Sequence, residues 1–264
     1  MLARSSGSLL SNPPLDAVVL IVLALKDARV DVDSPDGAVR ILASREGMDE
    51  ALVPLTRRAN KLGIVKYHVE WFDTEAALYA AFVHSVVEAD PDVIVGFEIQ
   101  GGSLGYLNDR HHHLLQGVPE DQREKLLRQL SRTPRGAENP QESRDDDYGR
   151  LHGAGMHSAG RIILNLWRLF RMELKLSSYS FHNCVHAILK QRVPRFEQQV
   201  LDAWFQSGQL WRSVEHVALR ATLNLRRIVA SDLVGRTAEF AKVFGIDFFS
   251  VLSRGSQYLS LIHI

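Results

Sequence analysis

The sequence predicts an α/β fold in which a mixed β-sheet is flanked by helices and followed by a helical C-terminal extension. Short apolar runs at residues 17–25 and 93–95 are typical of strands buried inside a sheet. Segments with helical spacing alternate with these runs in the first part of the chain. From residue 197 onward, the apolar residues repeat with helical spacing alone.

Length and composition limit the class of protein. The chain has 264 residues, enough for one large domain or two small ones with a proper core. Cys184 is the only cysteine, which excludes a disulfide framework and a cysteine-based zinc site. No apolar run reaches the roughly 18 residues that a membrane span requires. The start of the chain also lacks the apolar core of a secretory signal.

The net charge of zero hides an asymmetry between the two parts of the chain. Residues 1–150 hold 17 Lys and Arg against 24 Asp and Glu, whereas residues 151–264 hold 14 against 7. The C-terminal part is therefore the better candidate for a surface that faces a polyanion. The alternative is a set of ordinary solvated helix faces.

The first elements follow from local patterns. We expect residues 1–14 to be irregular and strands to occupy residues 17–25, 39–43 and 65–72. Thr74 is placed to cap a helix that runs to about residue 89. A strand at residues 93–95, a turn at Gly101 and Gly102, and a helix that begins after Ser103 come next.

The second part of the chain begins with a change in composition. Residues 116–155 are rich in polar, charged, Gly and Pro residues, which predicts a mobile surface insertion with a short helix near residues 120–130. Residues 161–166 are expected to form a strand that leads into a helix. Ser177 or Ser178 is expected to precede the next helix, and Pro194 to end it. Further helices are predicted at residues 197–205, 214–228 and 233–244, the last stopped by Gly245.

Several stretches, in this order, resemble the exonuclease-like region of family B DNA polymerases, and in particular of a translesion member of that family. They are residues 90–107, 130–134, 160–168, 189–194 and 245–258. The resemblance covers about residues 15–258 and implies a ribonuclease-H-like domain at 15–230 and the start of a polymerase region at 231–258. Residues 259–264 depart from the family pattern, and we expect them to be a non-native tail.

Proofreading exonucleases of this family hold two divalent metal ions with carboxylates from three sequence motifs. The resemblance implies that this chain starts after the first motif. In the second motif, active relatives have an Asp where Ser103 stands, and Glu98 is the only acid in this turn. In the third motif, His216 and Arg220 stand at the positions of a Tyr and an Asp.

These replacements remove the chemistry that metal binding needs. A serine hydroxyl is neutral, and a guanidinium offers donors but no acceptor. The charge of Arg220 would also repel a divalent cation at short range. We therefore expect no metal site and no catalytic residue, with Glu98, Ser103, His216 and Arg220 as vestigial exonuclease positions. Two alternatives stay open: an active 3′–5′ exonuclease with unusual metal ligands, and a protein-interaction module built on residues 116–155.

The resemblance further implies a parent DNA polymerase that works in the nucleus, copies DNA past lesions and takes part in DNA repair. Mg²⁺, an iron–sulfur cluster, primer-template DNA, deoxynucleotides and accessory subunits would belong to that parent, and no membrane is involved. This segment would hold no cofactor and would act as a scaffold and a wall beside DNA. The candidate nucleic-acid-binding residues are Arg226, Arg227, Arg236 and Arg254.

Two further motifs are expected to be structural. His111, His112 and His113 are consecutive, so in a helix their side chains point in different directions and cannot chelate a metal together. We interpret them as a solvated helix end. Cys184 lies on an amphipathic helix and is expected to be a small core residue.

Overall fold

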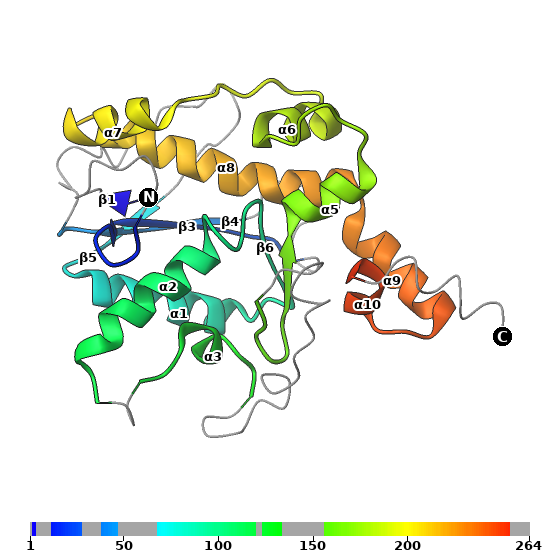
Figure 1. Ribbon diagram of the computed structural model, residues 1–264, viewed down its shortest axis with the longest axis horizontal. Coiled ribbons are helices and arrows are strands. Elements are labelled where there is room, and N and C mark those ends of the chain that lie inside the picture. Colours follow the sequence, from blue (N-terminus) through cyan, green and yellow to red (C-terminus); the bar gives the residue numbers. More distant parts are fainter. Residues whose placement is uncertain are drawn as a thin grey trace.

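The computed structural model describes residues 2–3, 12–27, 38–46, 68–119, 123–133 and 156–253. The described strands form two main sheets, with helices above and below them (Figure 1). One sheet is mixed: β4 (Ala38–Ser44) lies between antiparallel β3 (Leu20–Leu25) and parallel β5 (His68–Phe72). The other is a parallel pair of β6 (Val93–Gly96) and β7 (Ile162–Asn165). The predicted α/β class with a mixed sheet is confirmed.

The strands agree well with the apolar runs. The run at residues 17–25 forms β2 (Ala17–Val18) and β3, separated at Val19. A short strand, β1 (Leu2–Ala3), pairs antiparallel with β2. β4 is the most deeply buried strand, because Ile41, Leu42 and Ala43 are fully inaccessible to solvent. Of the strand predicted at residues 65–72, residues 65–67 lie outside the described part of the chain.

The helices below the sheets in Figure 1 are α1 (Glu75–Ala89), α2 (Leu104–Leu114) and α3 (Leu126–Gln129). A single 3₁₀ turn, η2 (Leu115–Gly117), follows α2. Thr74 caps α1 as predicted, since its Oγ1 accepts a hydrogen bond of 3.1 Å from the amide of Ala77.

The predicted surface insertion is partly wrong. The predicted short helix is present as α3, but Leu126 and Leu130 are fully buried in the core that α1 and α2 share, so this stretch belongs to the core and not to the surface. Polar neighbours hide this short apolar segment in the sequence. Residues 120–122 and 134–155 lie outside the described part of the chain.

Four helices lie above the sheets: α5 (Leu166–Glu173), α6 (Phe181–Leu189), α7 (Gln198–Gln206) and α8 (Leu210–Ala230). α6 begins after Ser180, whose hydroxyl accepts from the amide of Asn183 at 3.3 Å, so the predicted start after Ser177 or Ser178 is wrong. The predicted stop at Pro194 is also wrong. The helix ends at Leu189 because Lys190 adopts a left-handed conformation with φ of 56°.

The C-terminal extension consists of α9 (Leu233–Phe244) and α10 (Phe248–Ser253), which pack against each other. Gly245 ends α9 with φ of 66°, as predicted. A residue with a side chain would be strained at this angle, which explains the glycine.

α8 joins the two sheets from above. Its first half packs Leu210, Val214 and Ala218 against the three-stranded sheet. Its second half contributes Leu219 and Leu223 to the core around β6 and β7. One helix of 21 residues therefore covers the same side of both sheets.

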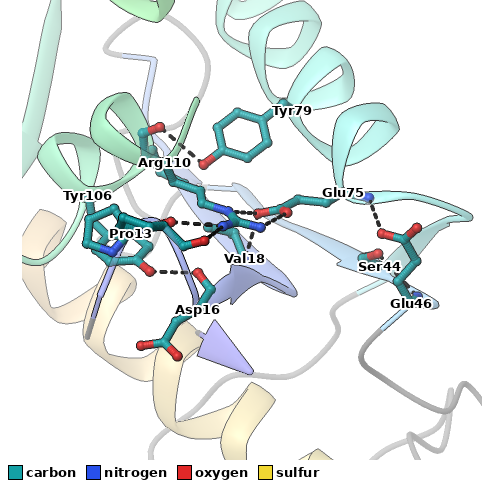
Figure 2. A network of polar contacts seen from close by, with 11 residues as sticks. Pro13, Asp16, Val18, Ser44, Glu46, Glu75, Tyr79, Tyr106 and Arg110 are labelled. Carbon is teal, nitrogen blue, oxygen red and sulfur yellow. Dashed lines mark hydrogen bonds and ion pairs between the residues drawn. The ribbon is translucent and has the colours of Figure 1, made fainter. Parts of the chain in front are cut away.

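A buried polar network ties the start of the fold to α1 and α2 (Figure 2). Arg110 makes a two-pronged contact with Glu75, with Nη2 to Oε2 at 2.7 Å and Nε to Oε1 at 3.0 Å. Glu75 also accepts from the amide of Val18 at 2.7 Å, and Arg110 donates to the carbonyls of Pro13 and Pro14. The carboxylate of Glu75 holds the pKa of Arg110 above its ordinary value.

We expect Arg110→Met to destabilise the fold strongly, because it leaves the Glu75 carboxylate buried without its partner. The expected loss is about 3–5 kcal/mol in the free energy of unfolding, measured by urea denaturation. The matched control is Arg45→Met, since Arg45 pairs with Asp73 at a site where the Asp73 side chain is 85% exposed. That variant should lose about 1 kcal/mol or less. Equal losses would contradict a stabilising role for the buried network.

Candidate exonuclease-like site

The turn after β6 carries two of the four vestigial positions. Gly102 donates to the carbonyl of Glu98 at 2.9 Å, and Gly105 donates to the carbonyl of Ile99 at 2.7 Å. A Cβ at Gly105 would lie 1.7 Å from the carbonyl oxygen of Gln100, so only glycine allows this close approach. The turn is therefore held in one compact shape by backbone contacts.

Glu98 and Ser103 are both exposed on this turn. Ser103 directly precedes α2, as predicted, but its side chain makes no capping hydrogen bond to the helix. Its hydroxyl lies instead over the end of β6, because a Cβ at Gly96 would meet Ser103 Oγ at 2.7 Å. The hydroxyl thus lies at the end of the strand, at the position for which the resemblance predicts a carboxylate in active relatives.

The other two positions lie on α8 and are less accessible. His216 is buried, and its ring packs edge-on against Phe196 with 5.4 Å between ring centroids. Its Nδ1 has no hydrogen-bond partner among the described residues. Burial, followed by the nearby charges of Arg220 and His182, lowers the pKa of His216 to about 4.

The guanidinium of Arg220 packs against the ring of Phe181. Its guanidinium carbon is 4.2 Å from the ring centroid of Phe181. Burial lowers the pKa of Arg220 from its ordinary value. The flat face of Phe181 attracts the positive charge, which favours this position for an arginine.

A second arginine completes what we call the Arg–Phe cluster, which consists of Phe97, Phe170, Phe181, Arg220 and Arg227. The guanidinium carbon of Arg227 lies 4.5 Å from the centroid of Phe181, 4.8 Å from Phe97 and 5.2 Å from Phe170. Phe97 meets Phe181 edge-on at 5.3 Å. Because Phe97 is the first residue after β6, the cluster connects the turn to α8.

Arg227 is fully buried, with 0% of its surface exposed. Its Nε donates to the carbonyl of Leu223 at 3.3 Å and its Nη2 to the side chain of Asn224, while Nη1 has no partner among the described residues. Burial lowers the pKa of Arg227 to about 9. The expectation that Arg227 faces nucleic acid is therefore wrong, because its guanidinium belongs to the core.

The other candidate nucleic-acid-binding residues lie in different settings. Arg226 is half-buried on α8. Arg236 is exposed on α9 and pairs with Glu173 of α5. Arg254 lies outside the described part of the chain.

The described residues do not suit a pair of divalent metal ions. They contain no group of three or more His, Cys, Asp or Glu side chains close enough to hold one. Glu98 is the single carboxylate among the four vestigial positions, and Arg220 brings a positive charge. An iron–sulfur cluster does not fit this segment either, because the chain has one cysteine, Cys184, and that residue is buried.

An open pocket of about 530 Å³ lies beside the turn. It is lined by Phe97, Glu98, Trp167, Arg171 and residues 177–180. The guanidinium of Arg171 lies 5.2 Å from the ring of Trp167, so one wall is an aromatic ring with a cation on it. Our sequence analysis missed this pocket. The available signal was Trp167, a large aromatic residue directly after the strand predicted at residues 161–166.

The structure also shows where the consecutive histidines and Cys184 lie. Cys184 is a core residue, as predicted, and burial raises its pKa. His111 is buried with its ring 5.5 Å from that of Tyr79, so the expectation of a solvated end is wrong for this residue. Within the described part of the chain, no helix is long and apolar enough to cross a membrane.

Known proteins match this chain over most of its length. The family described as DNA polymerase family B, exonuclease domain, matches residues 21–183. The DNA polymerase zeta catalytic subunit of Arabidopsis thaliana is 37% identical over 277 residues, which cover 97% of this chain and 14% of that protein. The Homo sapiens protein of the same name is 38% identical over 267 residues, with 97% and 8% covered.

A more distant relative is the DNA polymerase delta catalytic subunit of Plasmodium falciparum. It is 24% identical over 194 residues, which cover 72% of this chain and 17% of that protein. The chain thus spans less than a fifth of the length of each of these relatives. Because the exonuclease-domain family matches more than half of the chain, on an α/β fold with the expected strand, turn and helix, the chain belongs to the exonuclease domain of the family B DNA polymerases.

Proposed function

We propose that this segment is a ribonuclease-H-like exonuclease domain that lacks 3′–5′ excision and serves a DNA polymerase as a scaffold and as a wall beside nucleic acid. The position of Arg220 carries the proposal. Its guanidinium lies 4.2 Å from the ring of Phe181, at the position that corresponds to an acid in active relatives. A guanidinium cannot ligate a metal ion, since it has no acceptor atom.

The remaining positions support the same conclusion. Ser103 offers a neutral hydroxyl, and Glu98 alone supplies one exposed carboxylate. Hard divalent cations need several oxygen ligands. His216 is neutral at pH 7 because burial lowers its pKa to about 4, and it is mostly shielded from solvent. The four side chains at the predicted exonuclease positions therefore do not supply the ligands for metal-dependent excision.

The parent protein is proposed from its relatives. Polymerase zeta catalytic subunits match 97% of this chain. We therefore assign the segment to a translesion DNA polymerase that takes part in DNA repair in the nucleus, with primer-template DNA, deoxynucleotides and accessory subunits as partners. Mg²⁺ and an iron–sulfur cluster would belong to other parts of that polymerase. A polymerase that must extend mismatched ends gains from not excising them.

Domain boundaries belong to the same proposal. The exonuclease-like domain would cover residues 15–230, and α9 and α10 would begin the polymerase region at 231–258. Residues 254–264, including the expected non-native tail at 259–264, lie outside the described part of the chain.

An active exonuclease with unusual ligands is the second candidate, because Glu98 is exposed and lines the pocket beside the turn. A metal ion bound by the carboxylate of Glu98, beside the ring of Trp167, would need further ligands from outside the described residues. The two candidates differ in one measurable property, which is metal-dependent shortening of DNA.

We expect no excision by the purified chain. Single-stranded DNA labelled at its 5′ end is incubated with the protein and Mg²⁺ or Mn²⁺, and the products are resolved by length. The digestion should not exceed that of a control with chelator, and Glu98→Ala should change nothing. The matched variant is Asp109→Ala, which removes another exposed acid from α2. Excision that Glu98→Ala abolishes and Asp109→Ala leaves intact would instead establish the second candidate.

Binding to single-stranded DNA should depend on salt and on the proposed wall. The double variant Arg226→Gln and Arg236→Gln should weaken binding and reduce the slope of log affinity against log salt by about 0.7 per lost phosphate contact. Lys242→Gln is the control on the same helix as Arg236, since Lys242 is exposed and pairs with Glu239. Two results would exclude these arginines as a specific DNA contact. One is an affinity that does not depend on salt. The other is an equal loss of affinity in the double variant and in Lys242→Gln.

The buried imidazole of His216 should make the fold sensitive to acid. Its folded pKa of about 4 lies below the ordinary value of 6.5, so the unfolded chain binds the proton more readily between these values. Stability should therefore fall as the pH drops from 7 to 4, by roughly 3 kcal/mol from this residue.

Urea denaturation at several pH values measures this effect. His216→Phe should reduce the acid-induced loss, whereas His112→Phe, at an exposed position of α2, should not. His111 and His182 also have lowered pKa values, so part of the acid sensitivity should remain. An identical loss in the wild type and in His216→Phe would show that His216 is not held neutral by the fold.

A further inference from the structure

Aromatic and arginine side chains gather where α7 meets the start of α8. α7 packs against α8 and lies above it, away from the sheets (Figure 1). Trp204 comes from α7, and Trp211 and Arg212 come from the first turn of α8. Both indole rings are half-buried, whereas Arg212 is exposed. None of the three lines the pocket beside the turn or belongs to the Arg–Phe cluster.

The guanidinium of Arg212 contacts two indole rings. Its carbon lies 5.2 Å from the ring centroid of Trp211 and 5.7 Å from that of Trp204. The ring of Trp204 in turn meets Phe196, with 4.6 Å between ring centroids, and Arg195 directly precedes Phe196. We call these five residues the aromatic track. Three aromatic rings and one guanidinium thus form an unbroken series of contacts, with a second arginine next to it in the chain.

Neither arginine of the track forms an ion pair within the described part of the chain. Arg195 and Arg212 are both exposed, and no carboxylate among the described residues contacts them. By contrast, the exposed Arg45 and Arg236 each pair with a carboxylate. A guanidinium that stacks on an aromatic face keeps the N–H donors along its edge available to an acceptor. The track therefore presents positive charge beside partly exposed aromatic surface.

The charges around the track favour an anionic ligand. Asp202 and Glu215 belong to the same two helices, but both are half-buried and already have interaction partners. The exposed charged residues between positions 190 and 215 are mostly cations: Lys190, Arg192, Arg195 and Arg212, against the single acid Glu197. A surface with this excess of positive charge attracts anions.

We propose that the aromatic track binds single-stranded DNA, with unpaired bases stacked on Trp204 and Trp211 and with a phosphate bound by Arg212. The proposal rests on the proposed function, in which this domain lies beside nucleic acid. Aromatic side chains beside a positively charged groove are the usual means of binding single strands, and every base has a face that can stack. The track thus adds base stacking to the phosphate contacts expected of Arg226 and Arg236.

Unpaired bases suit the track better than a duplex does. In a duplex the bases already stack on one another, so their faces are not available to aromatic side chains. Phosphates alone would need exposed cations and no aromatic rings. The track combines the two features, and an unpaired nucleotide offers both a negative charge and a flat ring. Because stacking does not depend on the identity of the base, we expect little sequence preference.

The test compares two single strands that differ only in their bases. One is a labelled oligothymidine of about 12 nucleotides, and the other is an abasic strand of the same length with the same phosphates. Fluorescence anisotropy measures the affinity of the 264-residue chain for each, with chelator present so that no metal-dependent excision occurs. Oligothymidine should bind at least about tenfold more tightly, because the abasic strand has nothing to stack on the indole rings.

Variants locate this preference on the track. Arg212→Gln should weaken binding of oligothymidine by about fivefold or more and reduce the salt slope by about 0.7. Its matched control is Arg45→Gln, at another exposed arginine, which should leave the affinity unchanged. Trp211→Ala should remove most of the preference for oligothymidine over the abasic strand, whereas Trp211→Phe, which keeps an aromatic ring, should retain most of it.

Two outcomes would overturn the proposal. One is equal affinity of the unaltered chain for the two strands, and the other is an equal effect of Arg212→Gln and Arg45→Gln. If the double variant Arg226→Gln and Arg236→Gln still weakens binding in either case, the proposed wall beside DNA stands without the track. If no variant weakens binding and the affinity does not depend on salt, the wall fails together with the track.

Discussion

Arg227 is the point at which the separate parts of this domain meet. Its guanidinium lies within 5.2 Å of three phenylalanine rings, and these rings come from the end of β6, from α5 and from α6. A charged group can be buried in this way only if its surroundings offset the loss of water. The ring faces and two hydrogen bonds within α8 supply that compensation. The position of α8 against the turn after β6 follows from this cluster.

The same cluster determines the electrostatics of the exonuclease-like site. Arg220 and Arg227 both contact Phe181, so two positive charges lie close to the turn after β6. The turn nevertheless keeps its compact backbone, because Gly105 allows α2 to approach the carbonyl of Gln100. Aromatic and cationic packing thus holds this compact turn against α6 and α8.

The N-terminal and central parts of the domain depend on a different kind of interaction. The pair of Arg110 and Glu75 fixes the segment before β3 against α1 and α2 through backbone carbonyls and an amide (Figure 2). This network holds β3 in place, although β3 has only one strand neighbour in the described part of the chain. Together, the polar network and α8 hold β3 in place from its start and from one face.

Local sequence patterns determined much of the architecture. The strands at β3, β4 and β6, the Thr74 cap and the helix that ends at Gly245 were all predicted, because each depends on neighbouring residues alone. The residue that caps a given helix was harder to predict from the sequence. Ser180, and not Ser177 or Ser178, caps α6, because three closely spaced serines offer equivalent hydroxyl groups.

The sequence by itself determined which residue types stand at the predicted exonuclease positions, Ser103, His216 and Arg220, and their match to metal ligands of active relatives stays a prediction. Only the tertiary structure decided what these residues contact. It buried Arg227, which looked like a surface residue beside Arg226, and it placed Arg220 on Phe181. It also put Leu126 and Leu130 into the core from within a polar stretch. Burial of a side chain depends on which distant elements cover it, and that information is absent from local sequence periodicity.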